Sequence, residues 1–505
     1  MSLPPWTIPL LDPVAARAVD RWAIEERGIP GLDLMERAAE ALAAAVLEAA
    51  PQGRIAVVCG AGNNAGDGYA AARLLRKAWR DVDVFWARDP HELTGDAAVQ
   101  AQRLPGAAPA PFTVGCLAGC TLVVDALLGI GTAGAPRGAV ADAITAISAS
   151  GLPVVACDVP SGVDAATGEV AAPAIRALAT VTFDAPKIGL LVHPGKAHAG
   201  SLRVADIGIP RGAPSGDPRV GLIEDDPLLR LLSTRGPQWT KFTSGRVLIA
   251  GGSQGLLGAV VLAAQAAMRA GAGYVTACVP AGLEGAAAAQ LVEVMQIALP
   301  AQEGGHSRGG VAQVLESLAQ RRGTLVLGPG LGRHSGAAVF ARELAAKAPG
   351  PLVLDADGLG SFARELERLI ERDAPTVLTP HEGELARLLG VDSADVAGRR
   401  LHHARLAAER SGAIVVLKGD DTLIADPGGA VMVSPGASPA LATAGTGDVL
   451  SGVIGALLAR GEDPLVAACA GVRLHARAGG LAAQRLGVDG AIARDIIAEL
   501  PAARP

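Results

Sequence analysis

Short apolar runs recur along the chain, and most of them end at a glycine or a polar residue. In the first half these runs occupy five segments, at 54–59, 82–86, 122–124, 153–157 and 181–183. Short apolar runs bounded by turn residues are typical of buried strands. Longer stretches with helical spacing separate several of them, and this alternation favours βαβ units around parallel sheets. Polar residues at the ends of such strands converge on one crevice.

The same pattern begins again after residue 245 and predicts a second α/β unit. Its apolar runs occupy 247–250, 273–279, 324–327, 352–354, 376–378 and 414–417. The stretch 207–218 is rich in Gly and Pro, as linkers are. A chain of 505 residues exceeds the size at which one core stops growing. We therefore expect two α/β domains, over 1–215 and 235–505, joined by a linker over 216–234.

Composition narrows the class of protein. Half of the residues are hydrophobic and only 3% are aromatic, which fits packed α/β layers and argues against disorder. The net charge of −6, without a long basic run in the sequence, disfavours nucleic acid and anionic membranes as partners. The sequence contains no apolar run of membrane-spanning length, and its start does not resemble a signal peptide. The six scattered cysteines favour free thiols in a cytoplasmic protein.

The stretch 442–450 combines a small-residue loop with the start of a long apolar helix, and Asp448 lies at the junction. The first amides of a helix lack partners and attract anions. Gly445 and Gly447 let the backbone approach a phosphate, and Thr446 adds a hydroxyl. An acid among such amides suits a base that takes a proton from a hydroxyl during phosphoryl transfer. The alternative is that Asp448 only caps the helix.

Other predicted strand ends of the second half also carry chemistry. They are the glycine-rich 328–332, the acids Asp355 and Asp357, the turn 379–384 with His381, and the segment 418–422 with Lys418. A lysine at a strand end can bind phosphate. Carboxylates with phosphate oxygens suit Mg²⁺, and the acids at 355, 357, 382 and 384 are candidates among which the spacing does not decide. A lone histidine is usually structural, and no ligand spacing near His381 indicates zinc.

Three predicted strands of the first half end in loops that carry oxygen ligands. The loop 60–68 holds two adjacent asparagines, Asp125 follows a later strand, and 158–161 contains an acid and a serine. Strand, glycine-rich loop and helix form a phosphate-binding arrangement, although the pattern differs from the usual dinucleotide fingerprint. Asn, Asp and Ser oxygens at neighbouring strand ends can hold a cation. Each residue taken alone is more often a turn residue.

The segments 62–68, 125–131 and 158–162 resemble the signature loops of NAD(P)H-hydrate epimerases, and the similarity covers about residues 10–215. The resemblance implies a Rossmann-like three-layer αβα domain. It implies a potassium ion on Asn64, Asp125 and Ser161. It also implies substrate contacts from Asn63, Asn64, Ala65, Gly66, Asp67, Gly129, Ile130, Gly131, Thr132, Ala133, Gly134, Ala135 and Asp158. Asp125, Asp158 and Lys187 are the candidates for proton transfer, with their roles left open. The family usually has Gly where Ala65 stands.

The order of 328–330, 379–384, 418–419 and 445–448 resembles the NAD(P)H-hydrate dehydratases of the ribokinase-like superfamily, over about residues 235–500. The resemblance implies that Gly330, His381 and Asp448 contact the hydrate, with Asp448 as the catalytic base. It implies nucleotide binding by Lys418, Gly419, Asp420, Asp421, Thr422, Ser438, Gly445, Thr446 and Gly447. The segment 239–245 departs from the opening usual in that family, which puts a role for Lys241 in doubt.

Together the two resemblances imply a bifunctional enzyme that repairs hydrated NADH and NADPH. One half would interconvert the R and S hydrates, and the other would use ADP and Mg²⁺ to dehydrate the S form, giving NAD(P)H, AMP and phosphate. The resemblance favours ADP, whereas residue spacing does not distinguish ADP from ATP. We expect NADHX, NADPHX and ADP as small-molecule partners, and a homo-oligomer. The alternatives are a ribokinase-like kinase of a vitamin-precursor alcohol with a fused nucleotide-binding regulatory domain, and a non-catalytic regulator.

Overall fold

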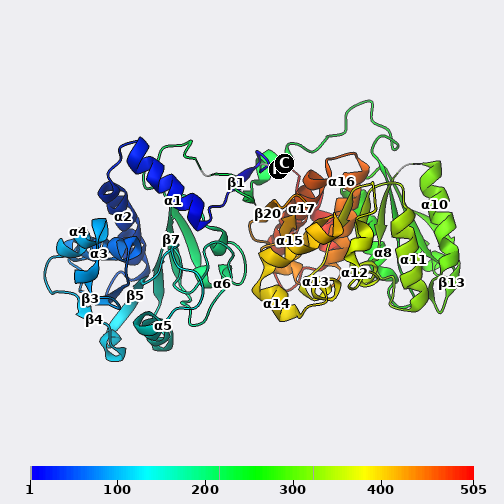
Figure 1. Ribbon diagram of the computed structural model, residues 1–505. Helices are drawn as coiled ribbons and strands as arrows, with labels where there is room; N and C mark the ends of the chain where they lie inside the picture. Colours follow the sequence, from blue (N-terminus) through cyan, green and yellow to red (C-terminus); the bar gives the residue numbers. More distant parts are fainter. Residues whose placement is uncertain (1–2, 215, 322, 505) are drawn as a thin grey trace. The chain divides into compact units, whose positions relative to one another are not determined.

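The computed structural model describes residues 3–214, 216–321 and 323–504. Its contacts divide the chain into two compact units (Figure 1). One unit, here the inserted unit, comprises residues 9–220. The other, here the outer unit, comprises the described residues before Pro9 together with those after Val220. Two α/β units built on parallel sheets confirm the predicted fold class.

Two expectations drawn from composition concern helices and cysteines. Among the described residues, every helix is too short or too polar to cross a membrane. All six cysteines are unpaired, and five of them are buried. The prediction of free thiols is therefore confirmed.

The inserted unit contains a seven-stranded parallel sheet with the strand order β4-β3-β2-β5-β6-β7-β8. Its strands are β2 (Arg54–Cys59), β3 (Val82–Trp86), β4 (Ala110–Pro111), β5 (Cys120–Ala126), β6 (Val154–Cys157), β7 (Ala179–Phe183) and β8 (Ser201–Ala205). Its helices are α1 (Pro13–Arg21), α2 (Gly31–Ala49), α3 (Asn63–Lys77), α4 (Gly95–Gln102), α5 (Gly138–Ser150) and α6 (Lys196–Ala199). Short turns of π- or 3₁₀-helix are η1 (Trp22–Glu26), η2 (Pro90–Glu92), η3 (Val114–Leu117) and η4 (Ile188–Leu190).

The alternation of side chains along β2 explains the three layers of this unit. Ile55 and Val57 pack in a cluster with residues of α2 and α3. Ala56 and Val58 point to the opposite face and pack with residues of α5. Because both faces of the parallel sheet are covered by helices, its strands are continuous apolar runs. The predicted αβα layering is therefore confirmed.

The outer unit contains an eleven-stranded sheet with the order β1-β9-β20-β19-β18-β17-β16-β15-β10-β11-β12. In the stretch β18-β17-β16-β15-β10-β11-β12 of this order, neighbouring strands pair in parallel. Strand β19 pairs antiparallel with both β18 and β20. The strands are β1 (Thr7–Pro9), β9 (Val220–Ile223), β10 (Arg246–Ala250), β11 (Tyr274–Pro280), β12 (Met295–Leu299), β15 (Thr324–Leu327), β16 (Leu352–Leu354), β17 (Thr376–Leu378), β18 (Ile414–Leu417), β19 (Leu423–Ala425) and β20 (Val431–Val433). A separate hairpin joins β13 (Ala301–Gln302) to β14 (Gly305–His306).

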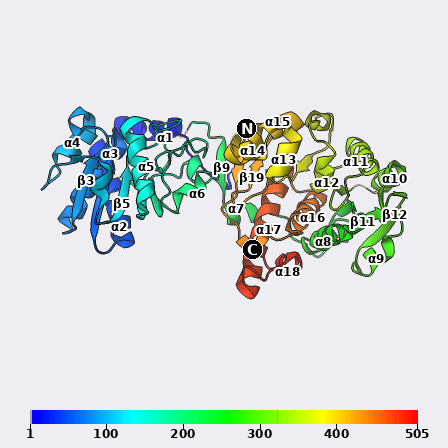
Figure 2. The same cartoon turned by 90° about the horizontal axis from the view of Figure 1, so that it is seen from below.

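Helices cover this sheet on both faces, with α8 and α16–α18 on one side and α11, α13 and α15 on the other (Figure 2). The helices are α7 (Asp225–Leu229), α8 (Leu257–Arg269), α9 (Glu284–Ala288), α10 (Val311–Gln320), α11 (Ser335–Lys347), α12 (Ala356–Gly360), α13 (Glu382–Leu389), α14 (Ser393–Gly398), α15 (Arg400–Ser411), α16 (Thr446–Ala459), α17 (Pro464–Leu486) and α18 (Ala493–Glu499). The 3₁₀ turns are η5 (Arg308–Gly310), η6 (Leu366–Leu369) and η7 (Pro439–Leu441).

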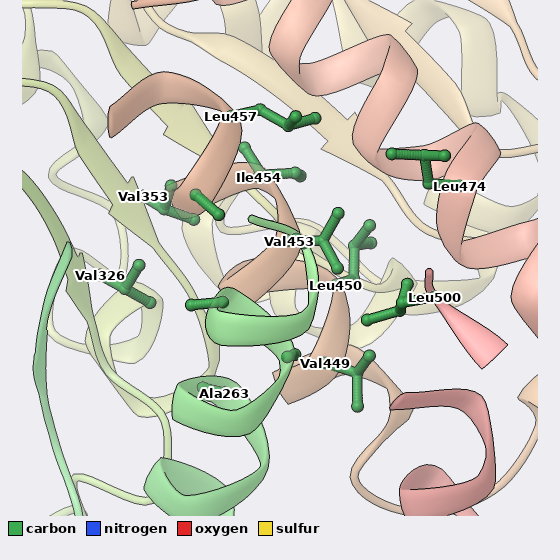
Figure 3. Packing of buried hydrophobic residues seen from close by; sticks show 14 of the residues in the cluster. Ala263, Val326, Val353, Val449, Leu450, Val453, Ile454, Leu457, Leu474 and Leu500 are labelled. Atoms are coloured by element: carbon green, nitrogen blue, oxygen red, sulfur yellow. The ribbon is translucent and has the colours of Figure 1, made fainter. Parts of the chain in front are cut away.

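Helix α16 is buried on nearly all sides, as its apolar sequence predicts. Val449 and Ile454 pack in one cluster with Ala263 of α8 and with strand residues such as Val326 (Figure 3). A Cβ atom on Gly452 would lie 2.2 Å from the Ala263 carbonyl oxygen, so glycine permits the close approach of α8. This packing fixes the first turn of α16 against the rest of the unit.

Strand β1 belongs to the sheet of the outer unit although it comes first in the chain. Trp6 is 4% exposed and lies in the core cluster that contains Ile223 and Leu228. The Glu224 N–H donates to the Trp6 carbonyl at 3.0 Å. The expected boundaries, 1–215, 216–234 and 235–505, therefore differ from this division in two places. First, the start of the chain packs in the outer unit. Second, the expected linker contains strand β9 and helix α7. Both differences arise because β1 and β9, which are far apart in the chain, lie side by side at one edge of the sheet.

Replacing Trp6 by Ala is expected to lower the free energy of unfolding of the outer unit by about 3–5 kcal/mol, because a large buried side chain leaves a cavity. Denaturant unfolding, with hydrogen exchange of the β9 amides, measures the loss. Trp79 is 96% exposed, so Trp79→Ala is the matched control and should change the free energy of unfolding by less than about 0.5 kcal/mol. Equal effects of the two variants would contradict the placement of Trp6 in this core.

Candidate functional site

The inserted unit has a cavity of about 510 Å³ at the carboxyl ends of its strands. Residues that follow β2, β5, β6 and β7 line it, which is where ligands bind in such sheets. The structure thus brings together nine of the predicted residues: Asn63, Asn64, Asp67, Gly129, Ile130, Gly131, Thr132, Asp158 and Lys187. The remaining predicted substrate contacts, at 65, 66 and 133–135, are not among the residues that line it. Ala65 is fully buried in α3, and 133–135 is exposed.

Asp125 and Ser161 are hydrogen-bonded to each other beside this cavity, and the backbone of Leu128 bonds to both Ser161 and Asn64. The Ser161 Oγ–H donates to Asp125 Oδ1 at 2.7 Å, and the Ser161 N–H donates to Oδ2 at 2.8 Å. Asn64 Nδ2 donates to the Leu128 carbonyl at 2.8 Å. Burial raises the pKa of Asp125, and the hydrogen bonds from Ser161 lower it. Asp125 is fully buried and does not line the cavity, so it is better placed to hold this group than to touch a substrate.

Asn64 Oδ1 is buried, and among the described residues it has no hydrogen-bond partner. A buried oxygen in this state costs free energy unless a ligand satisfies it. Carboxylate, amide and hydroxyl oxygens are the ligands that hard cations take. The orphaned oxygen, on a residue connected to Ser161 through Leu128, therefore fits the potassium ion that the resemblance to the epimerases implies.

Asp158 and Lys187 form a buried ion pair at the cavity wall. Lys187 Nζ lies 3.0 Å from Asp158 Oδ1 and donates to the Phe183 carbonyl at 2.7 Å. The Thr182 hydroxyl donates to the same Asp158 oxygen at 2.8 Å. Asp158 has a φ of 61°, a conformation that is uncommon for residues other than glycine and often occurs at functional sites. The pair is thus held rigidly where a ligand can reach it.

Among the further carboxyl groups that line the same cavity are those of Asp20, Asp67 and Asp184. Burial is the main cause that raises the pKa of each. For Asp67 the neighbouring Asp158 and Asp20 raise the pKa further, and Lys187 lowers it. Acids crowded around one lysine do not all ionise together. The cavity therefore presents carboxyl groups with raised pKa values beside an ion pair, and such groups are suited to proton transfer.

In the outer unit, the first turn of α16 has no side-chain cap. Gly445 is the N-cap, with a φ of 90°, and no side chain bonds the helix start. Asp448 lies inside the first turn. The interpretation of Asp448 as a helix cap is therefore wrong, because no side chain forms a capping hydrogen bond at this helix start.

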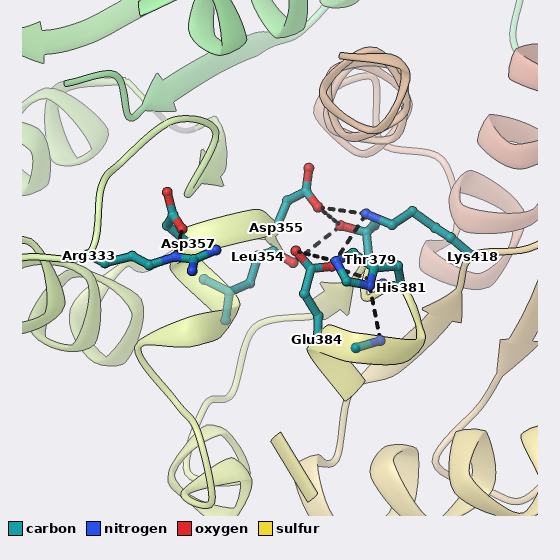
Figure 4. Close-up of polar contacts among 9 residues, drawn as sticks. Arg333, Leu354, Asp355, Asp357, Thr379, His381, Glu384 and Lys418 are labelled. Carbon is teal, nitrogen blue, oxygen red and sulfur yellow. Dashed lines mark hydrogen bonds and ion pairs between the residues drawn. The ribbon is translucent and has the colours of Figure 1, made fainter. Parts of the chain in front are cut away.

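The environment of Asp448 moves the pKa of its carboxyl group toward neutral pH. Its pKa is raised to about 7, first by burial and then by the neighbouring Asp355, while Lys418 acts in the opposite direction. Lys418 Nζ lies 3.3 Å from Asp355 Oδ1 and 3.6 Å from Glu384 Oε2 (Figure 4). A Cβ on Gly447 would lie 3.4 Å from Lys418 Nζ, so this ammonium lies against the start of α16. A carboxyl group and a cation thus meet at an uncapped helix start, a place where phosphate groups commonly bind in proteins.

A cavity of about 370 Å³ lies beside this turn. Seven of the predicted nucleotide-binding residues line it: Lys418, Gly419, Asp420, Thr422, Ser438, Thr446 and Gly447. Asp421 and Gly445 are not among the residues that line it, and Asp421 is 1% exposed. Leu441 and Val472 give the cavity an apolar part that suits a base, whereas the Lys418 end suits phosphate groups.

His381 is the N-cap of α13. Its Nδ1 accepts from the Gly383 N–H at 3.0 Å, and its own N–H donates to Glu384 Oε2 at 2.9 Å. Burial lowers the pKa of His381, so the ring is neutral near pH 7. The side chain is 55% exposed. His381 therefore has a structural role, and its exposed ring also leaves it open to a ligand.

The glycine-rich loop after β15 lies against Asp357. The Gly332 N–H donates to Asp357 Oδ2 at 3.1 Å. Gly328 has a φ of 124°, and a Cβ there would lie 1.9 Å from the Asp355 carbonyl oxygen, so only glycine fits. Gly330 packs closely on the Leu256 carbonyl. The structure thus joins the 328–332 loop to the acids that follow β16.

The acids considered for Mg²⁺ already have partners. Asp355 and Glu384 share Lys418, Glu382 pairs with Arg400, and the fourth acid binds the glycine-rich loop. No three His, Cys, Asp or Glu residues within the described ranges form a group that can hold a metal ion. Mg²⁺ usually binds through one or two carboxylates together with phosphate oxygens. These residues therefore fit a metal that arrives with a nucleotide, and provide no cage of their own.

Two family models match the chain. One, described as NAD(P)H-hydrate dehydratase, matches residues 247–502, and the other, described as YjeF-related protein N-terminus, matches residues 31–189. The bifunctional NAD(P)H-hydrate repair enzyme of Moorella thermoacetica is 39% identical over 509 residues, covering 96% of this chain and 94% of that protein. The chain belongs to the family of bifunctional NAD(P)H-hydrate repair enzymes.

The chain is also similar to a second curated relative and to a solved structure. The repair enzyme of Escherichia coli is 33% identical over 490 residues, covering 96% of this chain and 92% of that protein. A solved structure, the ADP/ATP-dependent NAD(P)H-hydrate dehydratase from Bacillus subtilis co-crystallised with ATP and Mg²⁺, is 27% identical with a TM-score of 0.47, covering 55% of this chain and 94% of that chain. Membership in the repair-enzyme family confirms the predicted fusion and supports a repair enzyme over a kinase.

Asp20 and Arg400 are examples of residues at these sites that the sequence does not predict, and Lys241 lies away from both sites. Asp20 reaches the cavity of the inserted unit from α1, and Arg400 reaches the 418–422 loop from α15. Neither belongs to a motif, so only the tertiary fold reveals them. Lys241 packs over the Phe242 ring, near the start of β11 and away from the strand ends that carry the site.

Proposed function

We propose that this repair enzyme returns hydrated NADH and NADPH to their native forms in two steps, each with its own site. The cavity of the inserted unit interconverts the R and S hydrates. The site at the start of α16 dehydrates the S form with ADP as the phosphoryl donor. The observation that carries the proposal is Asp448, a carboxyl group with a pKa near 7 beside Lys418 at an open helix start.

In the proposed dehydration, Asp448 takes the proton of the C6 hydroxyl as its oxygen attacks the terminal phosphoryl group of ADP. The amides at Thr446 and Gly447 and the Lys418 ammonium stabilise the charge that develops. Magnesium, when bound with the nucleotide, supplies further positive charge at the phosphates. The C6–O bond then breaks, phosphate leaves, and loss of a C5 proton restores the double bond. The products are NAD(P)H, AMP and phosphate.

In the proposed epimerisation, the lone pair of the ring nitrogen expels the C6 hydroxyl as water, and water then adds to the other face. The step needs an acid for the departing oxygen and a base for the incoming water. Lys187 and Asp158 line the cavity, and we assign proton transfer to this pair. Asp125 is assigned to the cation group with Asn64 and Ser161, because both of its oxygens accept hydrogen bonds there.

Potassium, when bound, supplies a fixed positive charge that holds the 60–68, 125–131 and 158–162 loops together. Epimerisation is therefore expected to fall at least tenfold when choline replaces potassium at equal ionic strength. Dehydration of pure S hydrate should stay within about twofold of its rate in potassium. Absorbance of the NADPH formed measures dehydration directly when S hydrate is supplied. It measures epimerisation when R hydrate is supplied, because that hydrate must first be converted to the S form. Asn64→Leu, which removes the orphaned oxygen, should remove the dependence on potassium along with most of the epimerisation.

The pKa of Asp448 predicts how dehydration depends on pH. The base must be ionised, so kcat/KM for the S hydrate should fall tenfold per pH unit below about pH 7 and level off above it. Initial rates from about pH 5.5 to about pH 8.5 under saturating ADP give the profile. A flat profile across this range would exclude Asp448 as the base.

One assay tests the proposed function. Purified protein is incubated with mixed R and S NADPH hydrate, Mg²⁺ and either ADP or ATP, while NADPH absorbance is followed. Full recovery is expected with ADP. Recovery of only the S half would remove the epimerase assignment, and no recovery with either nucleotide would remove the dehydratase assignment. The homo-oligomeric state and the cytoplasmic location stay predictions.

A further inference from the structure

Arg400 is a buried arginine that the proposed mechanism does not use. It begins α15 and is 2% exposed. An arginine in such a position is costly unless every charge and hydrogen bond is satisfied. Its five N–H donors form a rigid fork that a lysine does not reproduce. The partners of this fork therefore indicate what the residue holds in place.

On one side, the guanidinium binds the loop that lines the nucleotide cavity. Arg400 Nε donates to Asp421 Oδ2 at 3.2 Å, and Nη2 lies 3.1 Å from Asp421 Oδ1. Nη2 also donates to the Lys418 carbonyl at 3.3 Å. A Cβ on Gly419 would lie 2.4 Å from Nη2, so glycine at this position leaves room for the fork. The backbone of 418–421 is thus fastened to α15.

On the other side, the same guanidinium binds the loop that carries His381. Arg400 Nη1 lies 2.5 Å from Glu382 Oε1. Glu382 is the first residue of α13 and directly follows His381, whose ring is open to a ligand. One side chain therefore spans from the nucleotide loop to the hydrate loop.

We propose that Arg400 is a positioning residue that sets the His381 loop and the Lys418 loop at the separation that phosphoryl transfer requires. The inference rests on the proposed function of this site. Transfer needs the hydroxyl oxygen and the phosphoryl group close together and in line, and small misplacements are costly. Asp421, which lies outside the cavity, acts through Arg400 and not on the nucleotide.

Three variants separate this role from simple stabilisation. Glu382→Ala cuts only the hydrate side and should raise KM for the hydrate about fivefold, with KM for ADP unchanged. Asp421→Asn weakens only the nucleotide side and should raise KM for ADP alone. Arg400→Lys keeps the charge but loses the fork, so both KM values should rise and kcat should fall about tenfold or more.

Arg372→Lys is the matched control. Arg372 is also fastened by backbone carbonyls, of Ala348 and Gly350, but it lies near the start of β17 and not at the strand end that carries the site. Its replacement should lower the melting temperature without moving either KM. Arg400→Lys, in contrast, should raise both KM values even if its melting temperature falls by the same amount.

Two results would overturn the proposal: wild-type kcat and KM in Arg400→Lys, or equal shifts of both KM values in Glu382→Ala and Asp421→Asn. Failure of the proposed function looks different, because the wild-type protein would then recover no NADPH from S hydrate with ADP. Epimerisation, measured in the same samples, should be unchanged in all variants. It serves as an internal standard, because it belongs to the inserted unit, which none of the substitutions touches.

Discussion

Asp448→Asn is expected to lower the rate of dehydration by about 10³-fold or more, because removal of a general base typically costs two to four orders of magnitude. Asparagine keeps the shape of the side chain and cannot accept the hydroxyl proton. Epimerisation should continue at the wild-type rate, since it belongs to a different unit. The R/S ratio of the hydrate, followed by chromatography, and NADPH absorbance measure the two activities in one sample.

The same variant is expected to unfold at a higher temperature. Burial disfavours the ionised carboxylate of Asp448, so its charge destabilises the folded state at any pH above the ordinary pKa of the group, and most strongly above about pH 7. A neutral side chain removes this cost, which we expect to be about 1–2 kcal/mol at pH 8 and absent near pH 4. Asp373→Asn, at an exposed acid, is the control and should change neither activity nor stability. Loss of both activities in Asp448→Asn would refute the division into two sites.

Lys187→Met is expected to lower epimerisation by about 10²-fold or more while S hydrate is still dehydrated at the wild-type rate. Methionine fills much of the same space but leaves Asp158 without its ammonium partner and removes a proton donor from the cavity. In the presence of ADP, a mixed hydrate pool should then stop at recovery of the S half. Chiral separation of the residual hydrate should show only the R form.

Exposed Lys77 at the end of α3 provides the control, and Lys77→Met should leave full recovery intact. Thermal unfolding of the inserted unit distinguishes a lost proton donor from a lost fold. Full recovery by a folded Lys187→Met protein would remove the lysine from the proposed mechanism.

The central strands were predictable from the sequence because they are buried on both faces. The runs 54–59, 324–327 and 352–354 coincide with β2, β15 and β16. Strand β1 and the strands at its side of the sheet were not predicted. Their pairing depends on contacts between residues that are far apart in the chain, and their short sequences carry no local signal.

The site could be predicted where its chemistry is carried by a contiguous motif. Asp448 and Lys418 follow strand ends or start helices, so their spacing reveals them and the structure places them together. Asp20 and Arg400 lie in helices among other polar residues, a pattern that equally fits a solvated face. Their roles depend on where α1 and α15 pack, which no periodicity encodes.

The position of β1 has a consequence for the order in which the protein is made. A ribosome releases β1 about 200 residues before β9, its neighbour in the sheet. At typical rates of synthesis this interval is roughly ten seconds or more, long enough for a domain to fold. The nascent chain therefore carries an unpaired strand and the apolar side chain of Trp6 while residues 9–220 fold first. Slow translation or slow folding of that segment lengthens the time for which this aggregation-prone end waits for its partner.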